Sequence, residues 1–172
     1  MESQNRNVLN IQTGQFSQQL INQRTDQLYN KLILALNSDS LTYSDICKIN
    51  HQGLYIIFDD LEILYVGKTN RTGKIRIREL ASDFRSHTFN KKLLSRRFRD
   101  LGLVFEVLKN ETKEQWILTG IMSENIFKSH QKDVNSYIKQ HLKFKFHQEQ
   151  DARLLISFEH YAIAILNPMH ND

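Results

Sequence analysis

Residues that cross-link, kink or loosen a chain are scarce in this sequence. Its 172 residues include one cysteine (Cys47), one proline (Pro168) and six glycines. A single thiol excludes an internal disulfide and a zinc site built from several cysteines, and it fits a reducing cytoplasm. So few glycines and prolines leave little room for low-complexity linkers, and we expect one main domain.

Long apolar segments are also missing. The chain starts with the polar segment MESQNRNVLN, which does not resemble a signal peptide. No stretch approaches the roughly 20 apolar residues that a membrane helix needs. We therefore expect a cytoplasmic protein. Hydrophobic residues still make up 40% of the sequence, which is enough for a buried core.

Positive charge is concentrated in one part of the chain. The net charge is +4 and the isoelectric point is about 9.2. Most of the excess lies in residues 68–99, which contain Lys68, Arg71, Lys74, Arg76, Arg78, Arg85, Lys91, Lys92, Arg96, Arg97 and Arg99. A block this basic favours a polyanionic partner such as nucleic acid. The alternative is an ordinary solvated helix face.

The segment 53–67, GLYIIFDDLEILYVG, contains two apolar runs around an acidic tip. Both runs are rich in β-branched and aromatic residues, so the segment predicts a β-hairpin. Tyr55 and Tyr65 lie ten positions apart, an even number, so a regular hairpin brings both phenols to one neighbourhood. The alternative for both tyrosines is strand packing with the hydroxyl at the rim.

The rest of the pattern predicts an α/β (α+β) chain with a small mixed or antiparallel sheet of three to four strands flanked by helices. Strands are expected over 103–108 and 142–147. Helices are expected over 16–37, 43–48, 74–84, 90–101 and 151–166. The polar segment 113–141 is expected to form an inserted pair of helices that meet near Ser129. We assign residues 1–50 to an N-terminal helical extension and 51–172 to the main domain.

Two motifs at the hairpin ends, Gly53-Leu54-Tyr55 and Tyr65-Val66-Gly67, resemble the signature of the GIY-YIG nuclease superfamily. A basic helix is expected soon after the second motif. The stretch 158–171, FEHYAIAILNPMHN, resembles the terminal block of the family, in which a helical glutamate precedes a Pro-x-x-Asn ending. The resemblance covers about residues 51–108 and 142–171. It implies the GIY-YIG fold and a metal-dependent endonuclease that hydrolyses DNA to leave a 5′-phosphate and a 3′-hydroxyl.

The resemblance also implies roles for single residues. Glu159 would bind Mg²⁺ or Mn²⁺, and Tyr55 would be the general base, assisted by Tyr65. A phenol with an ordinary pKa near 10 needs nearby positive charge or a metal to lose its proton, and Lys68 is placed to supply that charge. Asn171 would hydrogen-bond the backbone around the tyrosine strands.

The catalytic arginine has two candidates. Arg76 is preferred because an aliphatic residue, Ile77, follows it, as in typical members of the family; Arg78 is the second choice. Contacts with double-stranded DNA are expected from Arg78 and from the helix over 90–101, which carries Lys91, Lys92, Arg96 and Arg97. Four histidines, at positions 87, 147, 160 and 170, have no metal-site spacing and are expected at the surface or in supporting positions.

The chain is short, and it resembles stand-alone members such as restriction endonucleases. Cleavage of both strands would call for a homodimer or higher oligomer, or for sequential nicking. Two alternatives stay open. One is a nucleic-acid-binding module that keeps the fold and has lost catalysis, and the other is a nuclease of DNA repair or mobility.

Overall fold

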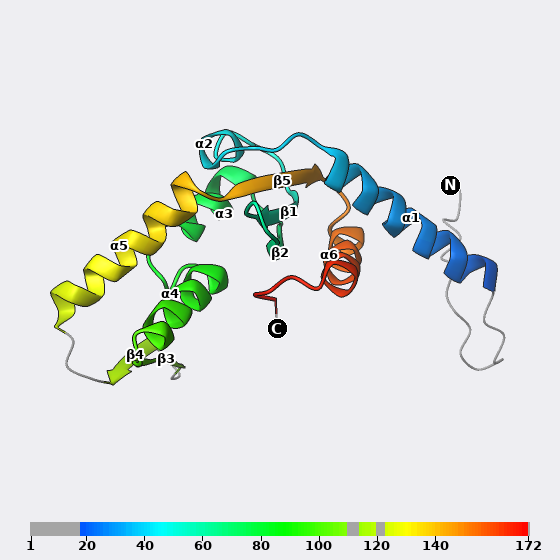
Figure 1. Cartoon of the computed structure of the whole chain (residues 1–172). Helices are drawn as coiled ribbons and strands as arrows, with labels where there is room; N and C mark the ends of the chain where they lie inside the picture. The colour runs from blue at the N-terminus through cyan, green and yellow to red at the C-terminus, as the bar shows by residue number, and fades with distance from the viewer. Residues whose placement is uncertain (1–17, 110–113, 120–122, 172) are drawn as a thin grey trace.

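The computed structural model describes residues 18–109, 114–119 and 123–171. It is a mixed α/β structure (Figure 1). Its elements are α1 (Gln18–Asn37), α2 (Tyr43–Ile46), β1 (Gly53–Phe58), β2 (Ile63–Thr69), α3 (Gly73–Leu80), α4 (Thr88–Asp100), β3 (Val104–Lys109), β4 (Glu114–Thr119), α5 (Glu124–Gln140), β5 (Lys143–Gln148) and α6 (Ala152–Leu166). Within the described ranges, none of these helices is both long and apolar enough to cross a membrane.

The predicted hairpin supplies two strands of a three-stranded antiparallel sheet in the order β2-β1-β5. The uniformly apolar β1 is the middle strand and is buried along almost its whole length. Tyr55 pairs with Gly67 on β2 and with Phe146 on β5. At the acidic tip, the carboxylate of Asp59 accepts the backbone N–H groups of Leu61 and Glu62 at 2.9 and 3.0 Å, which closes the turn.

Alternation along the hairpin divides the core between the two faces of the sheet. Leu54, Ile56 and Val66 face one cluster, which α1 and α6 complete with Leu32, Ala35, Leu155, Phe158 and Ala162. Tyr55 and Ile57 face a larger cluster built with α2, α3, α4 and α5. Figure 1 shows α1 and α6 on one side of the sheet and α4 and α5 on the other. The first helix therefore covers the sheet, although residues 16 and 17, where we expect it to begin, lie outside the described residues.

The expectation of two helices over 113–141 is wrong. β4 pairs with β3 in a separate two-stranded antiparallel sheet, with Val104 opposite Thr119 and Lys109 opposite Glu114. The β4 sequence, EQWILT, contains an aromatic and β-branched residues that suit a strand. α5 then runs unbroken through Ser129, because no glycine or proline interrupts it and one apolar stripe is buried throughout. Of the two arrangements expected for the sheet, mixed or antiparallel, the structure has the antiparallel one, since all the strand pairs described are antiparallel.

The end of α6 directs the following residues back to the hairpin. Asp151 begins the helix by accepting the N–H groups of Arg153 and Leu154 at 2.8 and 3.1 Å. Asn167 ends it with a left-handed backbone, φ 44°, directly before Pro168. The chain then follows the outer edge of β2, where the N–H groups of Met169 and His170 donate to the carbonyls of Ile63 and Leu64.

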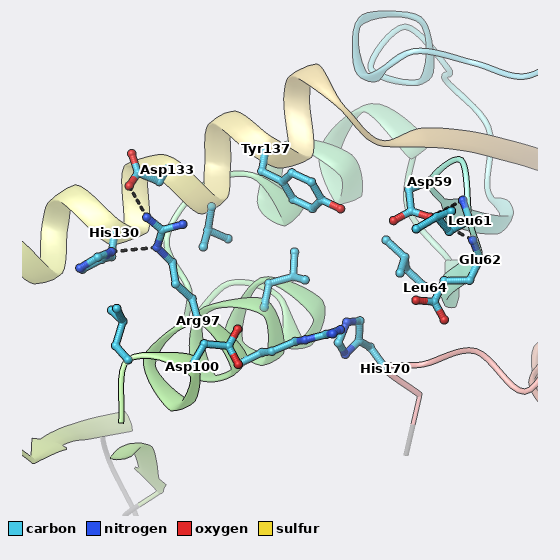
Figure 2. A pocket seen from close by; sticks show the side chains of 14 residues that line it. Asp59, Leu61, Glu62, Leu64, Arg97, Asp100, His130, Asp133, Tyr137 and His170 are labelled. Carbon is cyan, nitrogen blue, oxygen red and sulfur yellow. Dashed lines mark hydrogen bonds and ion pairs between the residues drawn. The ribbon is translucent and has the colours of Figure 1, made fainter. Parts of the chain in front are cut away.

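A cleft of about 630 Å³ opens between the hairpin tip, α4 and α5 (Figure 2). Asp59 and Glu62 line it at the hairpin, Arg97 at α4 and Tyr137 at α5. Its rim therefore carries both signs of charge. A cleft of mixed charge is less suited to a polyanion than a uniformly basic surface.

Candidate active site

Tyr55 and Tyr65 lie against each other on one face of the sheet, as their spacing predicts. Their ring centroids are 6.3 Å apart and the rings are inclined by 27°. Tyr55 is only 1% exposed. Gly67 lies directly opposite and leaves room for it, because a Cβ at position 67 would stand 2.5 Å from the Tyr55 hydroxyl oxygen. The second glycine of the hairpin therefore has a packing role at the tyrosine pair.

The buried Tyr55 hydroxyl has two nitrogen-bearing neighbours. His87 Nε2 lies 2.9 Å from the hydroxyl oxygen, and the positive charge of the Arg76 guanidinium acts on the same hydroxyl. Burial raises the pKa of Tyr55 above its ordinary value, the neighbouring Tyr65 raises it further, and Arg76 opposes both effects. The net shift is the opposite of the lowering expected from Lys68. In this structure Tyr55 is a protonated phenol at neutral pH.

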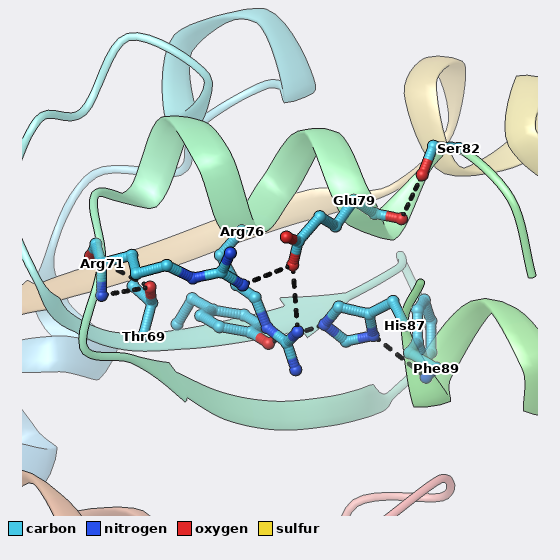
Figure 3. A network of polar contacts seen from close by, with 8 residues as sticks. Thr69, Arg71, Arg76, Glu79, Ser82, His87 and Phe89 are labelled. Carbon is cyan, nitrogen blue, oxygen red and sulfur yellow. Dashed lines mark hydrogen bonds and ion pairs between the residues drawn. The ribbon is translucent and has the colours of Figure 1, made fainter. Parts of the chain in front are cut away.

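The structure brings Arg76 to the tyrosines and leaves Arg78 elsewhere. Arg76 lies on the face of α3 toward β1, and its Nη1 also lies 3.2 Å from Glu79 Oε2 (Figure 3). Glu79 accepts from Arg71 at 2.8 Å as well, so one carboxylate orients two guanidinium groups. Arg78 is exposed and lines a separate cavity of about 460 Å³ with Tyr43, Lys48 and Lys139. Of the two candidate arginines, only Arg76 is in reach of the phenols.

Glu159 approaches the hairpin from α6. Its Oε1 accepts the backbone N–H of Lys68 at 3.0 Å, and its Oε2 pairs with the Lys68 ammonium. The two side chains are only 15% and 25% exposed. Burial raises the pKa of Tyr65, Arg76 opposes the rise, and the Glu159 carboxylate adds to it. Glu159, Tyr65 and Arg76 thus belong to one electrostatic cluster at the end of β2.

Asn171 closes the site from the C-terminal segment. Its Oδ1 accepts the N–H of Val66 and its Nδ2 donates to the carbonyl of the same residue, both at 2.7 Å. Val66 lies between Tyr65 and Gly67, so the expected contact with the tyrosine strands is present. The paired hydrogen bonds hold the outer edge of β2 in place at the residue that follows Tyr65.

The chemistry of the donors at Glu159 fits Mg²⁺ or Mn²⁺ better than zinc. Each carboxylate oxygen has one contact with Lys68 and keeps a further lone pair. Among the described residues, no group of three or more histidine, cysteine, aspartate or glutamate side chains is placed to hold a metal together. A hard cation that keeps several of its own waters needs only one or two protein carboxylates, whereas zinc prefers three or four protein ligands.

The expected DNA-contact residues on α4 separate into two groups. The Arg97 side chain binds two residues of α5, donating to Asp133 at 2.7 Å and to His130 at 2.8 Å. Lys92 and Arg96 line a cavity of about 480 Å³ beside the C-terminal segment, together with Arg99, Met169 and His170. Lys91 lies on the same helix and is half-buried. Lys92, Arg96 and Arg99 therefore form a cluster of basic residues on the side of α4 next to residues 168–170.

His87 has a more specific place than the sequence indicates. It begins α4, is 2% exposed, and contacts the Tyr55 hydroxyl. Desolvation, followed by the charge of Arg76, lowers the pKa of His87 to about 3, so the ring is neutral at pH 7. No local sequence motif predicts this contact, because it depends on the path of the loop between α3 and α4, which brings His87 next to Tyr55. Of the other histidines, His160 is exposed, His147 packs edge-on against Phe158 and His170 is buried.

Comparison of the chain with protein-family models, with curated proteins and with solved structures found no match in any of the three. A proposal for the function therefore rests on the motifs of the sequence and on the geometry of this site.

Proposed function

We propose that this chain is a divalent-cation-dependent DNA endonuclease of the GIY-YIG superfamily. One observation carries the proposal. The side chains that the resemblance names come from distant segments, and they gather at one end of the hairpin: Tyr55, Tyr65, Lys68, Arg76, Glu159 and Asn171. A chance match to short tripeptides gives no reason for the arginine of α3 and the glutamate of α6 to meet the tyrosines.

The arrangement suits hydrolysis of a phosphodiester, which needs an activated water and neutralisation of charge on the phosphoryl oxygens. The planar fork of Arg76 is suited to two phosphate oxygens, and Glu79 holds it in orientation. The Tyr55 hydroxyl is the candidate general base, and the N–H of His87 and the positive charge of Arg76 would stabilise negative charge on its oxygen. Tyr65 would orient the water or the phosphate.

Glu159 would hold the cation, and Lys68 would neutralise the carboxylate in its absence. The cation would supply Lewis-acid stabilisation of the phosphate and acidify a bound water. Asn171 would keep β2, and with it Tyr65, in register.

A second candidate is a DNA-binding module without catalysis. Two observations favour it: the Tyr55 pKa is raised rather than lowered, and both oxygens of Glu159 already contact Lys68. Both features also describe an enzyme at rest, before substrate and cation bind. A cleavage assay separates the two candidates.

The test is cleavage of supercoiled plasmid and of mixed linear DNA in Mg²⁺ or Mn²⁺. Wild-type protein is expected to nick or linearise the DNA, whereas Tyr55→Phe and Glu159→Gln bind it without cutting. Tyr29→Phe, at an exposed tyrosine on α1, is the matched control and should cut normally. Binding without cleavage by the wild type under both metals would support the non-catalytic module. Normal cleavage by Glu159→Gln would show that Glu159 does not have the proposed role in catalysis.

Sequencing the cleaved ends then gives the recognition site and the stagger. Sedimentation of the protein with and without DNA shows whether a dimer forms. A fixed site with a fixed stagger favours a restriction role, and structure-dependent cleavage favours repair or mobility.

A further inference from the structure

His87 lies between two partners that together determine which ring nitrogen carries its proton. Its Nδ1 is 3.1 Å from the backbone nitrogen of Phe89, and its Nε2 is 2.9 Å from the Tyr55 hydroxyl oxygen. The backbone N–H of Phe89 can only donate, so Nδ1 has to accept. An imidazolium has donors at both nitrogens, so this contact requires a neutral ring with its proton on Nε2. The low pKa of the buried ring agrees with the neutral form.

We infer that His87 donates its Nε2–H to the Tyr55 hydroxyl and is a positioning residue for that oxygen, not the acceptor of its proton. This inference rests on the proposed function insofar as Tyr55 is the general base. The Arg76 guanidinium, whose charge acts on the same oxygen, also carries only donors. Neither side chain can take the phenolic proton.

A tyrosine–histidine proton relay is therefore excluded by the hydrogen-bond geometry. When Tyr55 ionises, its proton passes to water, and His87 keeps its own proton on Nε2 throughout. The His87 N–H then donates to the phenolate oxygen, beside the donors of the Arg76 guanidinium, whose charge acts on the same oxygen. Such donors, fixed before the charge develops, stabilise it without reorganisation.

The fold explains why His87 can hold this orientation. The residue precedes the first turn of α4, and its ring caps that helix by accepting the N–H of Phe89. The ring also lies 5.6 Å from the Tyr65 ring, edge-on. The first turn of α4 and the Tyr65 ring thus hold the His87 ring in the orientation in which its Nε2 faces Tyr55.

The inference is tested first without DNA, by the ¹⁵N chemical shifts of the histidine ring nitrogens in uniformly ¹⁵N-labelled full-length protein at pH 7. The His87 signals are assigned by their loss in His87→Gln. We expect a protonated Nε2 and an unprotonated Nδ1. A proton on Nδ1, or on both nitrogens, would overturn the inference. This result is independent of whether the protein cuts DNA.

Cleavage kinetics give the second test. His87→Gln keeps a side-chain N–H at about the reach of Nε2 and should retain activity within about tenfold. His87→Ala and His87→Phe have no donor and should lose about 100-fold in the cleavage rate, the typical effect of removing one such donor, while DNA binding stays unchanged. His141→Ala, at an exposed histidine at the end of α5, is the control.

Wild-type rates in His87→Phe would overturn the positioning role, and so would equal losses in His87→Gln and His87→Phe when both are folded by circular dichroism. A wild-type protein that never cleaves DNA would instead overturn the proposed function. The tautomer measurement would still decide the direction of the His87–Tyr55 hydrogen bond.

Discussion

Asn171 forms both of its amide hydrogen bonds with a single residue, Val66, accepting the N–H and donating to the C=O at 2.7 Å each. The amide thus occupies the outward-facing backbone groups of β2 as a neighbouring strand would. Because Tyr65 precedes Val66 directly, the position of the second tyrosine depends on this amide.

Asn171→Ala should therefore destabilise the protein and reduce cleavage together. Two lost hydrogen bonds at about 1 kcal/mol each predict a fall of roughly 2 kcal/mol in the free energy of unfolding. Urea unfolding at pH 7 measures it. Asn30→Ala, at an exposed position on α1, should change stability by less than about 0.5 kcal/mol. Equal effects in the two variants would contradict a bracing role for Asn171.

Lys68→Met should make stability depend more strongly on the cation. The substitution keeps the apolar stem and leaves the Glu159 carboxylate without its ammonium partner. We expect a lower melting temperature in chelator and a larger rise on adding Mn²⁺ than in wild type, because a cation bound only by the folded state stabilises it. Differential scanning fluorimetry over a Mn²⁺ titration measures both.

The control for that experiment is Lys128→Met, which removes an ammonium from an exposed pair with Glu124 on α5. It should leave the response to Mn²⁺ unchanged. If Lys68→Met also responds as wild type does, Glu159 does not bind the cation.

Acid should destabilise the wild type more than His87→Gln. The pKa of His87 is about 3 in the folded protein against an ordinary value of 6.5, so between these values the unfolded chain binds a proton that the folded one does not. The contribution of the neutral His87 ring to the free energy of unfolding is therefore fully present above pH 6.5 and is lost as the pH falls toward 3. The stability difference between the two proteins should shrink by about 2 kcal/mol from pH 7 to pH 5. Urea unfolding at both values measures it, and a constant difference would show that His87 titrates normally.

DNA affinity should depend on Lys92 and Arg96 and not on Arg97. Each phosphate contact contributes about one unit to the slope of log affinity against log salt. Lys92→Ala and Arg96→Ala should each reduce the slope by about one, measured by fluorescence anisotropy in chelator from 50 to 200 mM salt. Arg97→Ala is the matched control, because Arg97 already pairs with Asp133. An equal reduction in Arg97→Ala would place DNA across α5 as well.

The sequence predicts well those features that local patterns determine. The two apolar runs around an acidic tip and the even tyrosine spacing predict the hairpin and its paired phenols, and the helix expected over 151–166 is present as α6. The segment 113–141 is mispredicted because β4 is polar at its first two positions and its strand character depends on pairing with β3. The residue pattern of one segment does not show which other strand it will pair with.

The site divides in the same way. Motif residues indicate which side chains to consider, and the choice of Arg76 over Arg78 agrees with the face of α3 that meets the tyrosines. The sequence does not show that burial outweighs the positive charge near Tyr55, since desolvation depends on the packed surroundings. Nor does it show His87, whose contact with Tyr55 joins residues 32 positions apart through a loop of no regular pattern.

The short segment 168–171 also protects the molecule against self-association. β2 is the outer strand of the sheet, and the hydrogen bonds from Met169 and His170 to Ile63 and Leu64 occupy backbone groups that would otherwise lie open. An uncovered apolar edge strand is a template for pairing with another chain. Changes that displace this segment thus threaten solubility as well as the site, so affinity tags on this protein are better placed before α1.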